Sequence, residues 1–74
     1  MRGPFLSFDD VLCKAETDKA VLCDVQGNEV WIPKGQIHDD SEVFARNGKG
    51  RLVVTQWIAE QKKIDGIGDE YEED

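Results

Sequence analysis

The chain has 74 residues, two cysteines and a formal net charge of −7 at pH 7. A chain of this length forms one small domain, which buries only about 60% of the surface of its unfolded state. Two cysteines are too few for a disulfide scaffold, and there is no CxxC pair for zinc and no apolar run suited to a signal peptide or a membrane span. These features predict a soluble, cytoplasmic protein without a metal or cofactor.

The acidic residues are unevenly distributed along the chain. Residues 69–74 hold five of the sixteen acids and no base, which leaves residues 1–68 with eleven acids, nine bases and a net charge of −2. A body this close to neutral lacks the basic stripe that non-specific DNA binding requires. We therefore expect a single domain over residues 1–68 and a disordered acidic tail over residues 69–74.

Residues 8–16 fit both a helix and a strand. Some of their apolar residues follow a helical spacing, while others alternate as in an extended chain. A three-residue loop at 17–19 would pair Val11 with Val25, Cys13 with Cys23 and Ala15 with Val21, and would set all six on a shared core face. We therefore predict a strand with two buried free cysteines that behave as small hydrophobic side chains. The alternative for these cysteines is a disulfide or a redox switch.

The segment 19–34 has the pattern of a tight β-hairpin. Gly27 and Asn28 separate two apolar runs and tolerate positive φ, which favours a two-residue loop at these positions. Such a loop sets Asp24 opposite Trp31. One face then collects the apolar residues of both strands, namely Val21, Cys23, Val25, Val30 and Ile32. The other face receives Leu22, Asp24 and Trp31.

The rest of the sheet is predicted to follow a loop. Pro33 removes a backbone donor and indicates an edge strand, which is compatible with a homodimer. We predict a fourth strand at 41–46, a turn at 47–50 and a fifth strand at 51–54. A four-residue loop would pair Val43 with Val54, Phe44 with Val53 and Ala45 with Leu52.

A helix is predicted to close the domain. Residues 56–64 are mostly helix formers, and Thr55 has the hydroxyl group of an N-cap. The side facing the sheet would carry Trp57, Ile58 and Ile64. Gly66 would take the left-handed position after the helix, with Ile67 packing back. Together these elements predict a mainly β (α+β) fold, a five-stranded antiparallel bent sheet or partly open small barrel, SH3-like or OB-like, with one C-terminal helix.

Part of this pattern resembles a known family. The residues concerned are Lys19-Ala20-Val21-Leu22, Val30-Trp31-Ile32-Pro33-Lys34, and Val53-Val54 with Trp57-Ile58-Ala59. They are similar to a family of small, poorly characterised bacteriophage and prophage proteins with the pattern K-A-[IV]-L, a glycine turn, W-I-P-K-S and a closing strand and helix. The resemblance covers residues 19–64, with Gly35 in place of the serine. It implies a phage origin and a compact β fold, and it assigns no catalytic residue.

Two surfaces are candidates for binding. The first is an apolar partner-binding patch formed by Trp31, Leu22, Pro33 and Lys34. Trp31 is its main residue, because tryptophan is the residue most enriched among those that dominate interface energies. The alternative is that the helix covers Trp31 as a second small core. The second candidate is a phosphate clamp at the basic turn, formed by Arg46, Lys49 and Arg51, which would otherwise be merely solvated.

The remaining polar motif carries no chemistry of its own. His38-Asp39-Asp40 has no further ligands at a convincing spacing, so we expect ordinary polar surface. We therefore predict a non-enzymatic phage accessory or anti-host module in the host bacterial cytoplasm. It would bind and inhibit a host protein, as an anti-defence or anti-CRISPR-type inhibitor does. The alternative is a small barrel that binds nucleic acid or a nucleotide through the basic turn Arg46–Arg51.

Overall fold

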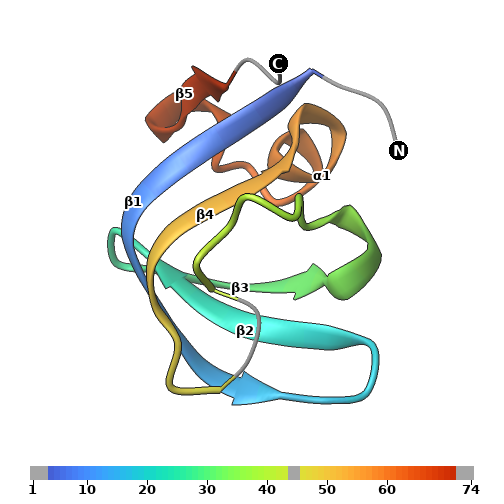
Figure 1. Cartoon of the computed structure of the whole chain (residues 1–74). Coiled ribbons are helices and arrows are strands. Elements are labelled where there is room, and N and C mark those ends of the chain that lie inside the picture. Colours follow the sequence, from blue (N-terminus) through green and yellow to red (C-terminus); the bar gives the residue numbers. More distant parts are fainter. Residues whose placement is uncertain (1–3, 44–45, 72–74) are drawn as a thin grey trace.

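The sheet is built around one long strand, β1 (Phe5–Glu16) (Figure 1). The computed structural model describes residues 4–43 and 46–71. The register of β1 shifts twice, between Phe8 and Val11 against β4 and between Cys13 and Ala15 against β2. Such bulges bend a strand, so β1 curves enough to pair with different strands along its length.

The other strands all run antiparallel to their neighbours. They are β2 (Ala20–Val25), β3 (Asn28–Pro33), β4 (Lys49–Thr55) and β5 (Asp69–Tyr71). The order is β3-β2-β1-β4, and β5 pairs with the N-terminal end of β1 on the edge opposite β4. The predicted mainly β fold is therefore confirmed: within residues 4–43 and 46–71, five antiparallel strands form one strongly bent, open sheet that is completed by a short helix. β3 is an edge strand, as Pro33 indicates.

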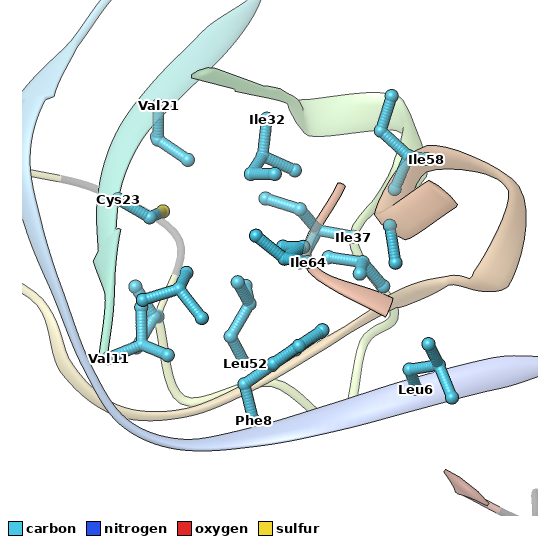
Figure 2. Close-up of a cluster of buried hydrophobic side chains, with 14 of the residues drawn as sticks. Leu6, Phe8, Val11, Val21, Cys23, Ile32, Ile37, Leu52, Ile58 and Ile64 are labelled. Carbon is cyan, nitrogen blue, oxygen red and sulfur yellow. The ribbon is translucent and has the colours of Figure 1, made fainter. Parts of the chain in front are cut away.

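The core lies on the concave side of this sheet (Figure 2). Val21, Cys23 and Ile32 of β2 and β3 point toward Phe8, Val11 and Leu52 of β1 and β4. Ile37, Ile58 and Ile64 close the remaining side. All nine are buried, and they provide the apolar burial that stabilises so small a domain.

The β2–β3 hairpin forms as predicted, but its loop lies one residue earlier. Gln26 and Gly27 occupy the loop with φ of 51° and 92°, which fits a type I′ turn. The Asp24 side chain accepts a hydrogen bond from the Gly27 N–H at 2.8 Å, and Asn28 bonds back to the Val25 carbonyl. These two side-chain bonds favour the observed loop over the predicted one at Gly27 and Asn28.

The earlier loop shifts the pairing by two residues. Trp31 therefore lies opposite Leu22 and not opposite Asp24 as predicted. Because side chains alternate with a period of two, a shift of two leaves every residue on its predicted face. The predicted core face is confirmed, with Val30 only partly buried.

Strand β1 replaces the helical interpretation of residues 8–16. Cys13 pairs with Cys23, as predicted. The bulge that follows moves Ala15 opposite Leu22 and not Val21, so the prediction that Ala15 faces the core is wrong. The bulge also leaves Lys14 on the outer side, where its ammonium bonds to Glu29.

The predicted fourth strand at 41–46 is wrong for residues 41–43, which form no strand. The hydroxyl of Ser41 donates to the Val53 carbonyl at 2.9 Å and accepts from the Val53 N–H at 2.7 Å. The Ser41 side chain thus bonds to both backbone groups of Val53, where a strand partner would use its own backbone, and the His38 N–H also donates to the Val53 carbonyl. β4 pairs with β1 instead. Residues 44 and 45, with the pairings predicted for them, lie outside the described residues.

Helix α1 (Gln56–Gln61) is shorter than predicted. The Thr55 hydroxyl accepts from the Ile58 N–H at 3.2 Å, so the predicted N-cap is confirmed. Ile58 and Ile64 are buried, but Trp57 is 58% exposed and does not face the sheet. Lys63, with φ of 62°, takes the left-handed position predicted for Gly66.

The chain then turns through η2 (Asp65–Ile67) into β5. Ile67 stays exposed and does not pack back as predicted. Residues 69–71 were expected in a disordered tail, and their pairing with β1 corrects that boundary for these three residues (Figure 1). Residues 72–74 lie outside the described part. Within the ranges 4–43 and 46–71, every helix falls short of the length and apolarity that a membrane span requires.

Candidate partner-binding face

An apolar row crosses the outer side of the sheet, away from the core. Trp31 lies opposite Leu22, and Leu22 lies opposite Ala15 on β1. Directly opposed residues of antiparallel strands project to the same side, so the three form one row across β1, β2 and β3. Trp31 is 43% exposed, and the other two are half-buried. We call Ala15, Leu22 and Trp31 the apolar row.

The helix does not cover this row. α1 packs mainly against β4 and β1. With 43% of its surface exposed, Trp31 is not the second-core residue that the alternative required. Trp31 is therefore accessible on the outer side of an edge strand.

Pro33 extends the row at the end of β3. Pro33 is exposed and pairs with Ala20, two residues along from the Leu22 position and thus on the same side. Lys34 begins a short turn, η1 (Lys34–Gln36), and its ammonium lies 2.5 Å from a Glu16 carboxylate oxygen. The structure thus places Leu22, Trp31 and Pro33 on one face, whereas the predicted fourth member, Lys34, pairs with Glu16, which lies opposite the core residue Val21.

Leu12 also lies on this side, and the sequence analysis missed it. It pairs with Asp24 and is 38% exposed. The signal was present in the alternation of residues 11–13, where buried Val11 and Cys13 flank an outward position. It was overlooked because this segment also fitted a helix.

One border of the row is a three-charge network. The Lys14 ammonium lies 2.6 Å from Glu29 and 3.5 Å from Asp24. The hydrogen bond with Glu29, together with the charge of that carboxylate, raises the pKa of Lys14. The network holds a net charge of −1 beside the apolar row.

A second ion pair, between Glu16 and Lys34, lies at the ends of β1 and β3 on the other side of the sheet, because Glu16 lies opposite the core residue Val21. Glu16 also accepts from the backbone N–H of Arg46 at 3.2 Å. The hydrogen bond from Lys34, followed by that from Arg46, lowers the pKa of the Glu16 carboxyl. An open groove of about 350 Å³ lies here, lined by Glu16, Thr17, Asp18, Lys34 and Arg46. On the outer side, the apolar row with the charged Lys14–Asp24–Glu29 network beside it matches the arrangement of protein interfaces, in which polar groups surround an apolar centre.

The basic turn has a different environment from the one a phosphate clamp needs. Arg46 lines the groove, whereas Arg51 donates to the Asp40 carbonyl at 3.1 Å and lies over the Tyr71 ring. Lys49 is exposed at the start of β4. The three bases that we expected to act together therefore have different neighbours.

The backbone amides near this turn are also occupied. Asn47 donates its N–H to the Cys13 carbonyl at 2.9 Å, and Arg51 donates its N–H to Glu42 at 2.8 Å. A phosphate site built on such amides needs donors that point outward. Two of the amides that flank the predicted clamp are instead used inside the domain.

An aromatic cluster holds β5, and the sequence analysis missed it as well. His38 makes edge contacts with Phe5 at 4.6 Å and with Tyr71 at 5.6 Å between ring centroids. The Tyr71 hydroxyl donates to Asp40, whose N–H donates to His38 at 2.9 Å. The His38 side chain is only 10% exposed, so the prediction of ordinary polar surface is wrong for this residue. The cluster fastens β5 to the body.

Metal chemistry has no visible basis in the described ranges. Residues 4–43 and 46–71 contain no group of three or more His, Cys, Asp or Glu side chains placed to hold a metal ion. The chain's two cysteines lie together in the core. Comparison with protein families, with curated proteins and with solved structures found no match to this chain.

Proposed function

We propose that this protein is a non-enzymatic binding module that attaches to another protein through the apolar row. The observation that carries the proposal is the position of Trp31, exposed beside Leu22 on the side of the sheet opposite a complete core. Tryptophan in such a setting supplies a large, rigid contact surface and dominates interface energies. The pairing of Trp31 with Leu22 contributes to the sheet, while the exposed part of the ring stays available to a partner.

Charge indicates the chemistry of the partner. The chain carries a net charge of −7, and the Lys14–Asp24–Glu29 network beside the row adds local negative charge. A partner with basic residues around an apolar pocket would be attracted over a distance and would then receive Trp31. The resemblance to small phage proteins supports a bacterial host protein as that partner, bound and inhibited in the host cytoplasm as part of an anti-defence activity.

The test compares two exposed tryptophans. The full chain, Trp31→Ala and Trp57→Ala are immobilised and exposed to bacterial lysate, and retained proteins are quantified. Trp57 is the matched control because it is an exposed tryptophan on α1, an element that is not part of the row. We expect one host protein to be retained by the full chain and by Trp57→Ala but lost from Trp31→Ala.

The retained protein is then purified and titrated. Trp31→Ala should weaken the affinity by about 2 kcal/mol or more, and added salt should slow association of the unmodified chain. Retention that does not depend on Trp31 would contradict the proposal. Salt-sensitive binding of single-stranded DNA that is unchanged in Trp31→Ala would support the nucleic-acid alternative instead.

A further inference from the structure

Two thiols face each other inside the sheet. The sulfur atoms of Cys13 and Cys23 lie 3.2 Å apart, and both side chains are buried and free. They are the only cysteines of the chain. We propose that this pair is a redox modification site, at which a reversible intramolecular disulfide joins β1 to β2 without a change of fold. The proposal does not depend on the binding function.

The backbone pairing at this position suits a disulfide. The N–H of Cys13 donates to the Gly48 carbonyl at 2.8 Å, and its carbonyl accepts from Asn47 at 2.9 Å. Both backbone groups of Cys13 therefore point toward the turn that precedes β4 and away from β2, so Cys13 and Cys23 exchange no backbone hydrogen bond. Opposed residues of this kind have Cα atoms only about 4.5 Å apart in antiparallel sheets. Disulfides span Cα separations of about 4.4–6.8 Å.

Only a small movement closes the bond. The sulfur atoms must approach from 3.2 Å to about 2.05 Å. Rotation of the two side chains can supply most of this movement. The register irregularity between Cys13 and Ala15 lies directly beside the pair, where the strands are not held in strict register. The bond thus forms at a point of the sheet that can adjust.

Burial controls how fast the reaction proceeds. The thiolate is the reactive form, and burial raises the pKa of both thiols. Reaction with a small oxidant therefore requires a brief local opening of the β1–β2 pairing. With only two cysteines in the chain, the product of an isolated molecule is this one disulfide.

Oxidised glutathione, a small disulfide, serves as the oxidant. One cysteine thiolate attacks a glutathione sulfur, forms a mixed disulfide and releases one glutathione thiolate. The second cysteine thiolate then attacks the cysteine sulfur of the mixed disulfide and releases the other glutathione thiolate. The two thiols lose two protons and two electrons in total, and these reduce the glutathione disulfide to two thiols. A dithiol reductant reverses the reaction.

The bond would lie directly beneath the candidate binding face. The residues on either side of each cysteine lie on the outer side of the sheet. They are Leu12 and Lys14 beside Cys13, and Leu22 and Asp24 beside Cys23. Oxidation would therefore fix the spacing of the two strands that carry this face. It would also close the short loop between residues 13 and 23, which restricts the unfolded chain.

The experiment uses the reduced full chain. It is incubated under native conditions with glutathione over a graded range of redox ratios, the remaining thiols are blocked, and the product is digested with trypsin. Cleavage after Lys14 and Lys19 separates the two cysteines. We expect both thiols to be lost together, a linked pair of peptides covering 3–14 and 20–34, and a higher melting temperature that reductant restores to its original value.

Single-cysteine variants serve as controls. Cys13→Ala and Cys23→Ala each leave one thiol, which should give at most a glutathione adduct and no rise in melting temperature. Should these variants fail to fold, the peptide map of the unmodified chain decides alone. The proposal is overturned by disulfides between two chains, by a stable glutathione adduct, by thiols that stay reduced at every ratio, or by an oxidised form with a lower melting temperature.

Discussion

Gly68 lies against the ring of Phe8 so closely that no side chain fits between them. A Cβ atom on Gly68 would lie 2.7 Å from two carbon atoms of the ring and 3.3 Å from Cβ of Leu6. The φ of Gly68 is −95°, an ordinary value, so space alone requires the glycine. This contact allows the chain to pass over the core and enter β5.

Replacement of Gly68 by alanine should therefore destabilise the domain. The Phe8 ring is buried in the core and cannot retreat freely, so we expect a loss of about 1–3 kcal/mol in the free energy of unfolding. Gly66→Ala is the matched control, because no atom lies within 4 Å of its Cβ position. Urea melts of the two variants measure the difference. Equal stabilities would show that β5 does not pack as described.

Truncation of adjacent residues of β3 should lower the stability of the fold by very different amounts. Ile32 is fully buried, so Ile32→Ala should cost about 2–5 kcal/mol. Trp31 is 43% exposed on the other face, and Trp31→Ala should cost about 1 kcal/mol and leave a folded protein. Denaturant melts compare the two variants. A Trp31→Ala protein as unstable as Ile32→Ala would show that Trp31 serves the fold and not a partner.

The sequence predicts the side of the sheet on which a residue lies better than it predicts which residues lie opposite each other. Alternation of apolar residues identifies the core side of β2 and β3, and this result survives a two-residue shift of register because the period of a strand is two. The alternation of apolar residues does not predict the position of the loop, because that position depends on the hydrogen bonds that the Asp24 and Asn28 side chains make to the loop backbone. Such bonds are visible only in three dimensions.

Long-range contacts account for the larger errors. The sequence predicts a strand that begins at residue 41. Residues 41–43 form no strand, however, and the Ser41 hydroxyl bonds to both the N–H and the carbonyl of Val53. The acidic composition of residues 69–71 suggested disorder. Tyr71 nevertheless contacts the His38 ring and donates a hydrogen bond to Asp40, both of which lie far away in the sequence. The candidate face was predicted because Leu22 and Trp31 are close in the hairpin, and hairpin contacts are local in sequence.

The ion pair between Glu16 and Lys34 can be tested by titration of the Glu16 carboxyl. The hydrogen bond from Lys34 is the main cause of the lowered pKa of Glu16. A carboxyl whose pKa is lower in the folded state contributes stability above its unfolded pKa and loses that contribution as the pH falls through the folded pKa. In Lys34→Met, the NMR titration of the Glu16 carboxyl should move back toward the ordinary value of 4.5. An unchanged titration would mean that the pair does not form in solution.

The cysteine pair should make the reduced protein sensitive to alkaline pH. Burial raises the pKa of Cys23 above the ordinary value of 9.0, and it raises that of Cys13 as well. The unfolded chain then releases thiol protons at a lower pH than the folded chain. The stabilising contribution is therefore complete below about pH 9 and declines as the pH rises above it. For Cys23 alone we expect a loss on the order of 1 kcal/mol between about pH 8 and pH 10.

Urea melts with reductant present measure this loss. The double variant Cys13→Ala/Cys23→Ala provides the control, because it keeps every other group that titrates at alkaline pH, including Lys14, whose raised pKa acts in the same direction. The reduced protein should lose more stability than the double variant over this range. Parallel curves would mean that the thiols are solvated in the folded state and that the β1–β2 pairing is open around them.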